Sequence, residues 1–356
     1  MAMGQGRLGA LAMRLAHAGG LTAAARWIGA GQGCLLMFHR VAPSAAWSGL
    51  PNREFHIDAA FLGRLLDHVT ASGRDVVTLD GVLARLRDGG GRRFVNFSID
   101  DVYRDTMEVA APVFRSRNLP VTLFVTTGIP DGTVMLWQAG LEAILIARDQ
   151  VVLEDGCGAD AGTAEAKRRL FGRLAAAWEL DAPELRYRRF CALNGHDPAA
   201  LHDRNAVSWA MLEAVRDDPC VEIGAHTISH ARLSALPLEA ARREIAGCRA
   251  RLQERLGLPV RHFAFPYGRR GDCGERESAL AQQAGFATAA TTRHGLVGGA
   301  DLAGLHALPR NTLNGAHRHT SQAEVHLSGL GGLLAQVLDT PVLGARGLRA
   351  QGLRAT

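Results

Sequence analysis

The chain has 356 residues, of which 47% are hydrophobic, and this is enough to build one large domain with a sizeable core. Its formal net charge of +5 is modest, and no block of basic residues carries interleaved aromatic side chains, which argues against a nucleic-acid-binding protein. Charged residues are mixed along the chain, and no segment has the composition of a disordered region.

Residues 1–30 contain no acidic residue and carry Arg7, Arg14 and Arg26, which predicts a basic amphipathic helix. Arg14 interrupts the apolar run that a signal peptide needs, and no uncharged run approaches the ~20 residues of a membrane-spanning helix. Such a helix usually packs on its own domain, and contact with an anionic membrane surface is the alternative. We therefore expect a cytoplasmic protein, either free or peripheral to the inner membrane.

Short apolar runs alternate with helical patterns through residues 31–327, which we assign to one domain. The predicted strands are Cys34–His39, Phe94–Ile99, Val121–Thr126, Val221–Ala225, His262–Phe265, Phe286–Thr291 and Leu305–Leu308, with Arg74–Leu79 as a further candidate. The predicted helices are Ile57–Ser72, Leu79–Asp88, Asp105–Asn118, Val207–Asp217, Leu238–Leu256 and Glu275–Ala284. Strands that alternate with helices indicate parallel pairing, and this number of units predicts an α/β barrel rather than an open sheet.

The segment from about residue 137 to 205 breaks this alternation. It is rich in helical patterns, contains a Gly/Ala/Asp loop at 155–162 and has no convincing strand. We interpret it as a helical insertion between two barrel units that covers one end of the barrel. The last residues, 328–356, are rich in Gly, Leu and Arg, and are predicted to form a helix with a frayed tail.

Polar side chains recur where the predicted strands end, at the edge that carries the active site in a parallel barrel. Asp100 and Asp101 end one strand, and His226 ends another, with His230 four residues later. Taken singly, the aspartates fit a strand-end turn and the histidines a hydrogen-bonded pair. Together they favour a metal site, because two imidazoles and one carboxylate leave coordination positions open, while the second carboxylate is free to act as a base.

Three motifs carry a resemblance to a known family. Ser98-Ile99-Asp100-Asp101 resembles the Thr-Phe-Asp-Asp signature of the polysaccharide deacetylases (the NodB-homology domain), which include the nodulation chitooligosaccharide deacetylases. His226-Thr227-Ile228-Ser229-His230 is similar to their His-Ser/Thr-x-x-His motif, and Phe265-Pro266-Tyr267-Gly268 to their Pro-Tyr-Gly loop. Order and spacing agree over roughly residues 33–327. The resemblance implies a distorted parallel (β/α)7 barrel.

The resemblance also implies roles for single residues. Asp101, His226 and His230 would bind a divalent metal, usually zinc, and Asp100 would be the general base. The backbone N–H of Tyr267 would help to hold the oxyanion. The implied reaction removes an acetyl or other small acyl group from the amide nitrogen of an N-acylated sugar, in a free or lipid-linked oligo- or polysaccharide.

The chain departs from the family pattern in three places. Ala264 stands where many members have Arg, and Val102 stands where many have Gly. The Leu-x-His motif that supplies the general acid is not found, since the nearby histidines lie outside its frame: His306, His317, His319 and His326. We expect Arg310 to replace the missing Arg by pairing with Asp100, and a surface salt bridge is the alternative.

The missing acid motif keeps a second class of function open. A non-catalytic carbohydrate-binding or assembly protein could retain this fold. Enzymes that deformylate lipid-linked sugars or open ureide rings are further alternatives within the family. His39 ends the first predicted strand, where it either lines the site or has a structural role.

Overall fold

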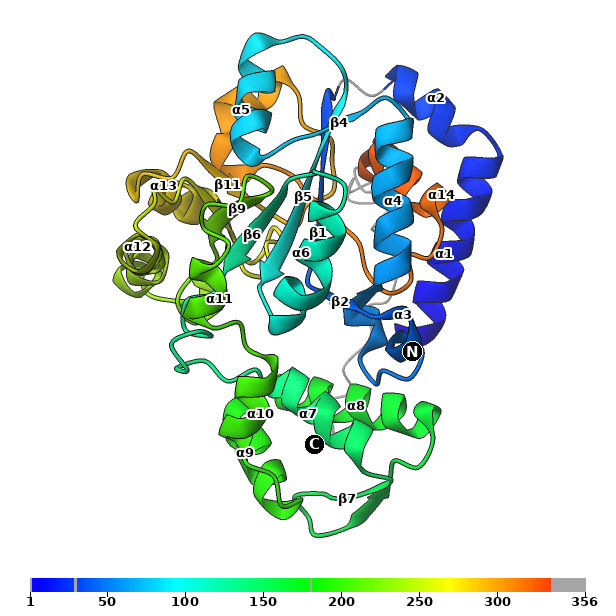
Figure 1. Cartoon of the computed structure of the whole chain (residues 1–356), viewed down its shortest axis with the longest axis vertical. Coiled ribbons are helices and arrows are strands. Elements are labelled where there is room, and N and C mark those ends of the chain that lie inside the picture. The colour runs from blue at the N-terminus through cyan, green and yellow to red at the C-terminus, as the bar shows by residue number, and fades with distance from the viewer. Residues whose placement is uncertain (1, 29–30, 180, 334–356) are drawn as a thin grey trace, which may run out of the picture.

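The computed structural model describes residues 2–28, 31–179 and 181–333. Its central strands are β1 (Gly33–Phe38), β4 (Asp75–Val76), β5 (Phe94–Asp101), β6 (Val121–Val125), β9 (Val221–Ala225), β10 (His262–Ala264), β11 (Thr288–Ala290) and β12 (Asn311–Thr312). They pair in parallel in the order β11-β10-β9-β6-β5-β1-β12, and β4 pairs with β5. The expected parallel α/β architecture is confirmed (Figure 1).

Helices follow the strands and surround the sheet (Figure 1). They are α4 (Ala59–Ala71), α5 (Leu79–Asp88), α6 (Ala111–Arg115), α11 (Trp209–Glu213), α12 (Leu238–Leu256), α13 (Glu275–Gln283) and α14 (Thr320–Leu327). Short elements between β1 and α4 are β2 (Arg40–Ala42), α3 (Ser44–Trp47) and β3 (His56–Asp58). Every residue of β1 and β5 is buried, which explains why β1 is apolar along its whole length instead of alternating.

The two ends of the sheet meet through one short segment. Leu308 bridges to Ala290 of β11, and Asn311 of β12 pairs with Leu36 of β1. Residues 308–312 therefore connect β11, at one end of the sheet, to β1. The prediction of a strand at Leu305–Leu308 is wrong, because a 3-10 helix occupies Gly299–Ala307 and pairing begins only at its end. A short apolar run fits either structure, and the glycines at its start favour the turn.

The predicted insertion forms a separate lobe at one end of the barrel (Figure 1). It consists of α7 (Trp137–Ala147), β7 (Gln150–Val152), β8 (Gly158–Asp160), α8 (Ala164–Glu179), α9 (Pro183–Leu193) and α10 (Pro198–Asn205). It has its own buried cluster, in which Trp178 packs edge-on against Phe190. The hairpin of β7 and β8 was missed because each strand has only three residues.

A buried guanidinium fastens this lobe to the barrel. Arg40, two residues after β1, donates to Asp105 Oδ2 at 2.6 Å, to Glu142 Oε2 at 3.3 Å and to Asn205 Oδ1 at 3.4 Å. Glu142 lies on α7 and Asn205 ends α10, so both ends of the lobe are bound to the residue that begins β2. The lobe is thereby placed beside the strand ends.

The N-terminal region forms two helices, α1 (Ala2–Ala18) and α2 (Leu21–Ile28), instead of one. Helix α1 packs against α14, and Leu11 and Leu15 stay exposed on its outer side. Within the described residues, we find no helix that is both long and apolar enough to cross a membrane. Most of the predicted C-terminal helix, residues 334–356, lies outside the described part of the chain.

Candidate active site

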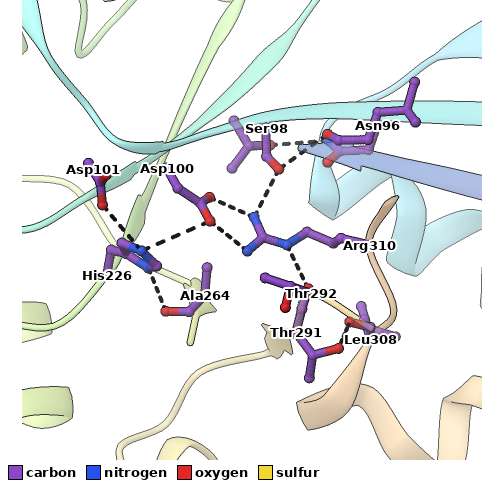
Figure 2. A network of polar contacts seen from close by, with 12 residues as sticks. Asn96, Ser98, Asp100, Asp101, His226, Ala264, Thr291, Thr292, Leu308 and Arg310 are labelled. Atoms are coloured by element: carbon purple, nitrogen blue, oxygen red, sulfur yellow. Dashed lines mark hydrogen bonds and ion pairs between the residues drawn. The ribbon is translucent and has the colours of Figure 1, made fainter. Parts of the chain in front are cut away.

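Three strand ends bring the predicted site residues together at one edge of the barrel. Asp100 and Asp101 are the last residues of β5, His226 directly follows β9, and Tyr267 comes shortly after β10. Figure 2 shows the two aspartates and His226 converging on one another. The C-terminal ends of parallel strands share one edge, which is why residues distant in sequence meet here.

One oxygen atom of Asp101 lies near both histidines. Oδ1 is 3.6 Å from Nε2 of His226 and 3.2 Å from Nε2 of His230. Nδ1 of His226 lies 2.8 Å from the carbonyl oxygen of Ala264, which can only accept, so Nδ1 carries the proton and Nε2 presents a lone pair. Burial lowers the pKa of His226 to about 4, which keeps the ring in the neutral form that binds metal ions.

These three side chains fit a divalent metal ion. Asp101 Oδ1 is buried and accepts no hydrogen bond, which is costly for a carboxylate oxygen unless a cation faces it. The three ligand atoms lie within 4.8 Å of one another. The two separations from Asp101 Oδ1, 3.6 and 3.2 Å, are close to the ~3.3 Å expected between neighbouring ligand atoms around tetrahedral zinc with bonds of ~2.0–2.1 Å. Asp101, His226 and His230 would hold the ion and leave positions open.

Asp100 is held by the buried Arg310, which directly precedes β12 (Figure 2). Both oxygens of Asp100 accept from Arg310, each at 2.7 Å. Arg310 also donates to Ser98 Oγ and to the carbonyl oxygen of Thr291, each at 3.0 Å, so its position is fixed. Burial alone would raise the pKa of Asp100, but the charge and hydrogen bonds of Arg310, together with the nearby His226 and His39, outweigh it and lower the pKa to about 2.

The expected contact between Arg310 and Asp100 is therefore present, and the alternative of a surface salt bridge is wrong, since Arg310 is fully buried. Sequence reasoning missed the groups that complete this arrangement, namely Ser98, Thr291 and the Ala264 carbonyl. Backbone carbonyls leave no sequence signal. The small side chain at Ala264 was the available hint, because it implied that another strand must supply the arginine.

Backbone strain is concentrated at the site. Positive φ angles occur at Asp101 (67°), Val102 (64°), Thr227 (66°), His230 (56°) and Tyr267 (61°). Non-glycine residues rarely adopt this region, and a β-branched residue such as Val102 does so at a cost of about 1–3 kcal/mol. The chain thus holds two of the proposed ligands, Asp101 and His230, and Tyr267 in unfavourable backbone conformations. Val102 adopts such a conformation at a position where the family often has glycine.

Tyr267 and His39 complete the edge. The Tyr267 ring lies 5.1 Å from that of His230 and is 38% exposed, while its N–H makes no hydrogen bond to another described residue. His39 stacks on Phe55 at 4.4 Å. Burial lowers the pKa of His39, which also interacts with the charges of Asp101 and Asp100. Of the two interpretations of His39, the structure therefore favours a residue that lines the site.

The late histidines do not reach this site. His317 and His326 form a buried pair on the outer side of the barrel, with their Nε2 atoms 3.2 Å apart, and His306 contacts the carbonyl oxygen of Phe286. Within the described chain, none of these three contacts the aspartates of β5. The general-acid histidine of the family motif therefore has no counterpart among them.

Comparison with known proteins agrees with the motifs. The model of the polysaccharide deacetylase family matches residues 170–289, a stretch that contains His226, His230 and Tyr267 but not Asp100 or Asp101. No curated protein matches the sequence. The fold resembles that of the Streptococcus pyogenes deacetylase PplD, solved with acetate, at 13% identity and a TM-score of 0.56, covering 83% of this chain and 97% of that one.

Two further solved structures are similar. IcaB from Ammonifex degensii is 19% identical with a TM-score of 0.52, and the match covers 84% of this chain and 97% of that one. A polysaccharide deacetylase from Bacillus cereus is 14% identical with a TM-score of 0.52, covering 83% and 68%. At these identities the likeness concerns the fold. The family match and the shared fold together confirm the resemblance that the motifs indicated, to the polysaccharide deacetylases.

Proposed function

We propose that this protein is a metal-dependent amide hydrolase that removes an acetyl group from the nitrogen of an N-acetylated sugar in an oligo- or polysaccharide. The observation that carries the proposal is the buried Asp101 oxygen, which lacks a hydrogen-bond donor, faces two imidazoles and adjoins a second carboxylate held by an arginine. A protein that only binds sugars has no need of a base beside a cation site.

Each group of the chain has a separate task in this proposal. Bound between Asp101, His226 and His230, a divalent metal such as zinc supplies Lewis acidity and lowers the pKa of water. Asp100 accepts the proton of the attacking water. Because Arg310 makes Asp100 a weaker base, the arginine contributes by fixing its orientation. The free N–H of Tyr267 donates to the oxyanion.

The leaving nitrogen also needs a proton, and we assign its delivery to His39. Burial lowers the pKa of this ring and disfavours its protonated form at rest, so His39 first takes up the proton that Asp100 received from the water and then donates it to the leaving nitrogen. Its ring lies within the electrostatic reach of Asp100, Asp101 and His230 and makes no hydrogen bond to another described side chain. It is not needed as a ligand. A His39→Gln variant should keep its metal, lose about 100-fold in kcat and lose one limb of the pH–rate profile. Unchanged kcat would assign the proton to another group.

The decisive experiment measures acetate release from N-acetylglucosamine oligomers by metal-free protein before and after addition of zinc. We expect release only with metal, and not with the Asp100→Asn variant. If the metal-loaded protein binds the oligomers without releasing acetate, the alternative of a carbohydrate-binding protein is correct. Release of formate from an N-formyl sugar, or ring opening of a ureide, without acetate release would assign one of the other reactions.

A further inference from the structure

Beside the proposed catalytic site lies a group of arginines that the reaction itself does not require. It consists of Arg232, Arg269, Arg270 and Arg293, which we call the arginine rim. These residues come from the loops that follow β9, β10 and β11, so they share the catalytic edge with His230 and Tyr267.

The contacts of these loops place the rim next to Tyr267. The Arg232 guanidinium lies 4.7 Å from the centre of the Tyr267 ring. Thr292, the residue before Arg293, donates to the Tyr267 carbonyl oxygen at 2.6 Å. Arg293 itself donates to the carbonyl oxygen of Cys273 at 2.6 Å, which holds it against the loop that carries Arg269 and Arg270.

The positive charge of the rim is mostly uncompensated. The buried Asp272 is the one acid in this loop, and its oxygens are engaged by Arg232 at 2.9 Å and by the backbone N–H of Arg269 at 3.1 Å. Among the described residues, neither Arg269 nor Arg270 pairs with a carboxylate, and both are exposed. Arg293 has a buried Nε without a hydrogen-bond partner.

One acid of the lobe faces the same region. Besides burial, the negative charge of Glu179, at the end of α8, raises the pKa of Tyr267. The carboxylate of Glu179 is exposed and forms no ion pair with any of the four arginines of the rim. The rim therefore presents guanidinium groups that are available to bind an anion. Guanidinium binds carboxylate and phosphate in the same planar, bidentate way.

We propose that the arginine rim binds an anionic group of the substrate, so that the protein acts on an acidic saccharide in which a carboxylate or phosphate lies close to the N-acetylated sugar. This inference rests on the proposed deacetylase function and names the class of its substrate. Because the rim adjoins Tyr267 and His230, the anion occupies a neighbouring sugar unit and not the acetyl group.

The test compares kcat/KM for three N-acetylated tetrasaccharides: a neutral N-acetylglucosamine tetramer, the same tetramer with one phosphate monoester, and an alternating tetramer of N-acetylglucosamine and glucuronic acid. We expect the metal-loaded protein to prefer an anionic substrate about tenfold, the scale of a few exposed charge contacts. The preference should weaken as salt is raised. The better of the two anionic substrates distinguishes phosphate from carboxylate.

The variant for this test is Arg269→Gln with Arg270→Gln, which should bring the ratio of anionic to neutral kcat/KM close to one. Arg242→Gln with Arg243→Gln is the matched control, because it removes an equally exposed adjacent pair from α12 and should keep the ratio. An unchanged ratio in the rim variant, or a wild type without preference, overturns the rim proposal and leaves the deacetylase proposal intact.

If no tetramer is deacetylated, the proposed function fails, and direct calorimetric binding decides the rim separately. Tighter binding of an anionic tetramer than of the neutral one, lost in the rim variant and kept in the control, supports the rim without catalysis. Equal binding of all three tetramers refutes it.

Discussion

The barrel carries two clusters of carboxylate and histidine side chains at its two edges, one with two histidines and one with two carboxylates. Both combine carboxylates with histidine, and in both the possible ligand atoms lie within 4.8 Å of one another. The catalytic-edge cluster follows the strands and consists of Asp101, His226 and His230. The opposite-edge cluster lies where strands and a helix begin and consists of Asp80, Glu222 and His262.

The two clusters differ in how fully their oxygens are used. In the opposite-edge cluster, Glu222 accepts from the N–H groups of Leu79 and Asp80 at the start of α5 and from Thr122 Oγ1, at 2.7 to 3.1 Å. His262 lies 3.2 Å from Asp80 Oδ1 and 3.4 Å from Glu222 Oε1. The carboxylates of the opposite-edge cluster accept hydrogen bonds from the chain itself, whereas Asp101 Oδ1 accepts none. Clusters built from similar residue types thus form an ion-pair network at one edge and, at the other, a set of potential ligand atoms that includes a carboxylate oxygen without a hydrogen-bond donor.

The largest expected effect is on bound zinc, which should be lost when the catalytic-edge cluster is changed and kept when the opposite-edge cluster is changed. His226→Ala should reduce bound zinc from one ion per chain to a trace and lower the deacetylation rate by roughly 1,000-fold or more, because the metal supplies both polarisation and the nucleophile. Elemental analysis of dialysed protein measures the first quantity. His262→Gln is the control and should keep its zinc. Loss of zinc from His262→Gln, with retention in His226→Ala, would reverse the two assignments.

The next effect divides the two adjacent aspartates. Asp100→Asn should keep the metal and lose about 100-fold or more in kcat, because the amide retains a similar shape but cannot take a proton. Elemental analysis and rate measurement on one preparation test both parts. Asp101→Asn provides the contrast, since it should weaken zinc binding. A near-normal rate in Asp100→Asn would place the base elsewhere.

A smaller effect on kcat is expected when Arg310 is replaced by lysine, which keeps the positive charge but not the planar shape of the side chain. Arg310→Lys should lower kcat about tenfold, because a point charge cannot replace the two parallel hydrogen bonds that orient Asp100. Arg74→Lys is a matched control, since Arg74 is buried and binds both oxygens of Glu324 away from the site. It should cost similar stability in urea unfolding and leave kcat unchanged. Equal kcat losses in both variants would make the role of Arg310 structural.

The smallest effect concerns the opposite edge and is a pH dependence of stability. Burial disfavours the charged His262 ring, but the bonds to Asp80 and Glu222 outweigh it and raise its pKa. Because the folded pKa is the higher one, this stabilisation is complete below the ordinary histidine pKa of ~6.5 and is lost as pH rises through the folded value. Urea unfolding at several pH values should show it.

In that experiment His262→Gln should flatten the decline in stability that the wild type shows as pH rises above about 6.5. The catalytic-edge cluster provides the contrast, because its histidines should respond to metal and the opposite-edge histidine should not. A decline of the same size in the variant would assign the pH dependence to other groups.

The alternation of apolar strands and helical patterns was sufficient to predict the parallel fold, because β1 and β6 are short, buried and largely apolar. The motif residues at strand ends predicted the edge at which the site lies. The role of the segment around Leu308 could not be predicted, because bridging two ends of a curled sheet depends on distant partners. The hydrogen bonds from the start of α5 to Glu222 could not be predicted either, because backbone donors have no sequence signature.

Residues 308–312 join the first and last strands, and Arg310 lies inside them. The orientation of the proposed base therefore depends on the pairing that joins the two ends of the sheet. A local opening that releases this segment would leave the metal ligands on β5 and after β9 in place, while freeing Asp100 from its partner. Heat or denaturant would then remove the proposed activity before it unfolds the barrel, while the proposed metal ligands stay together.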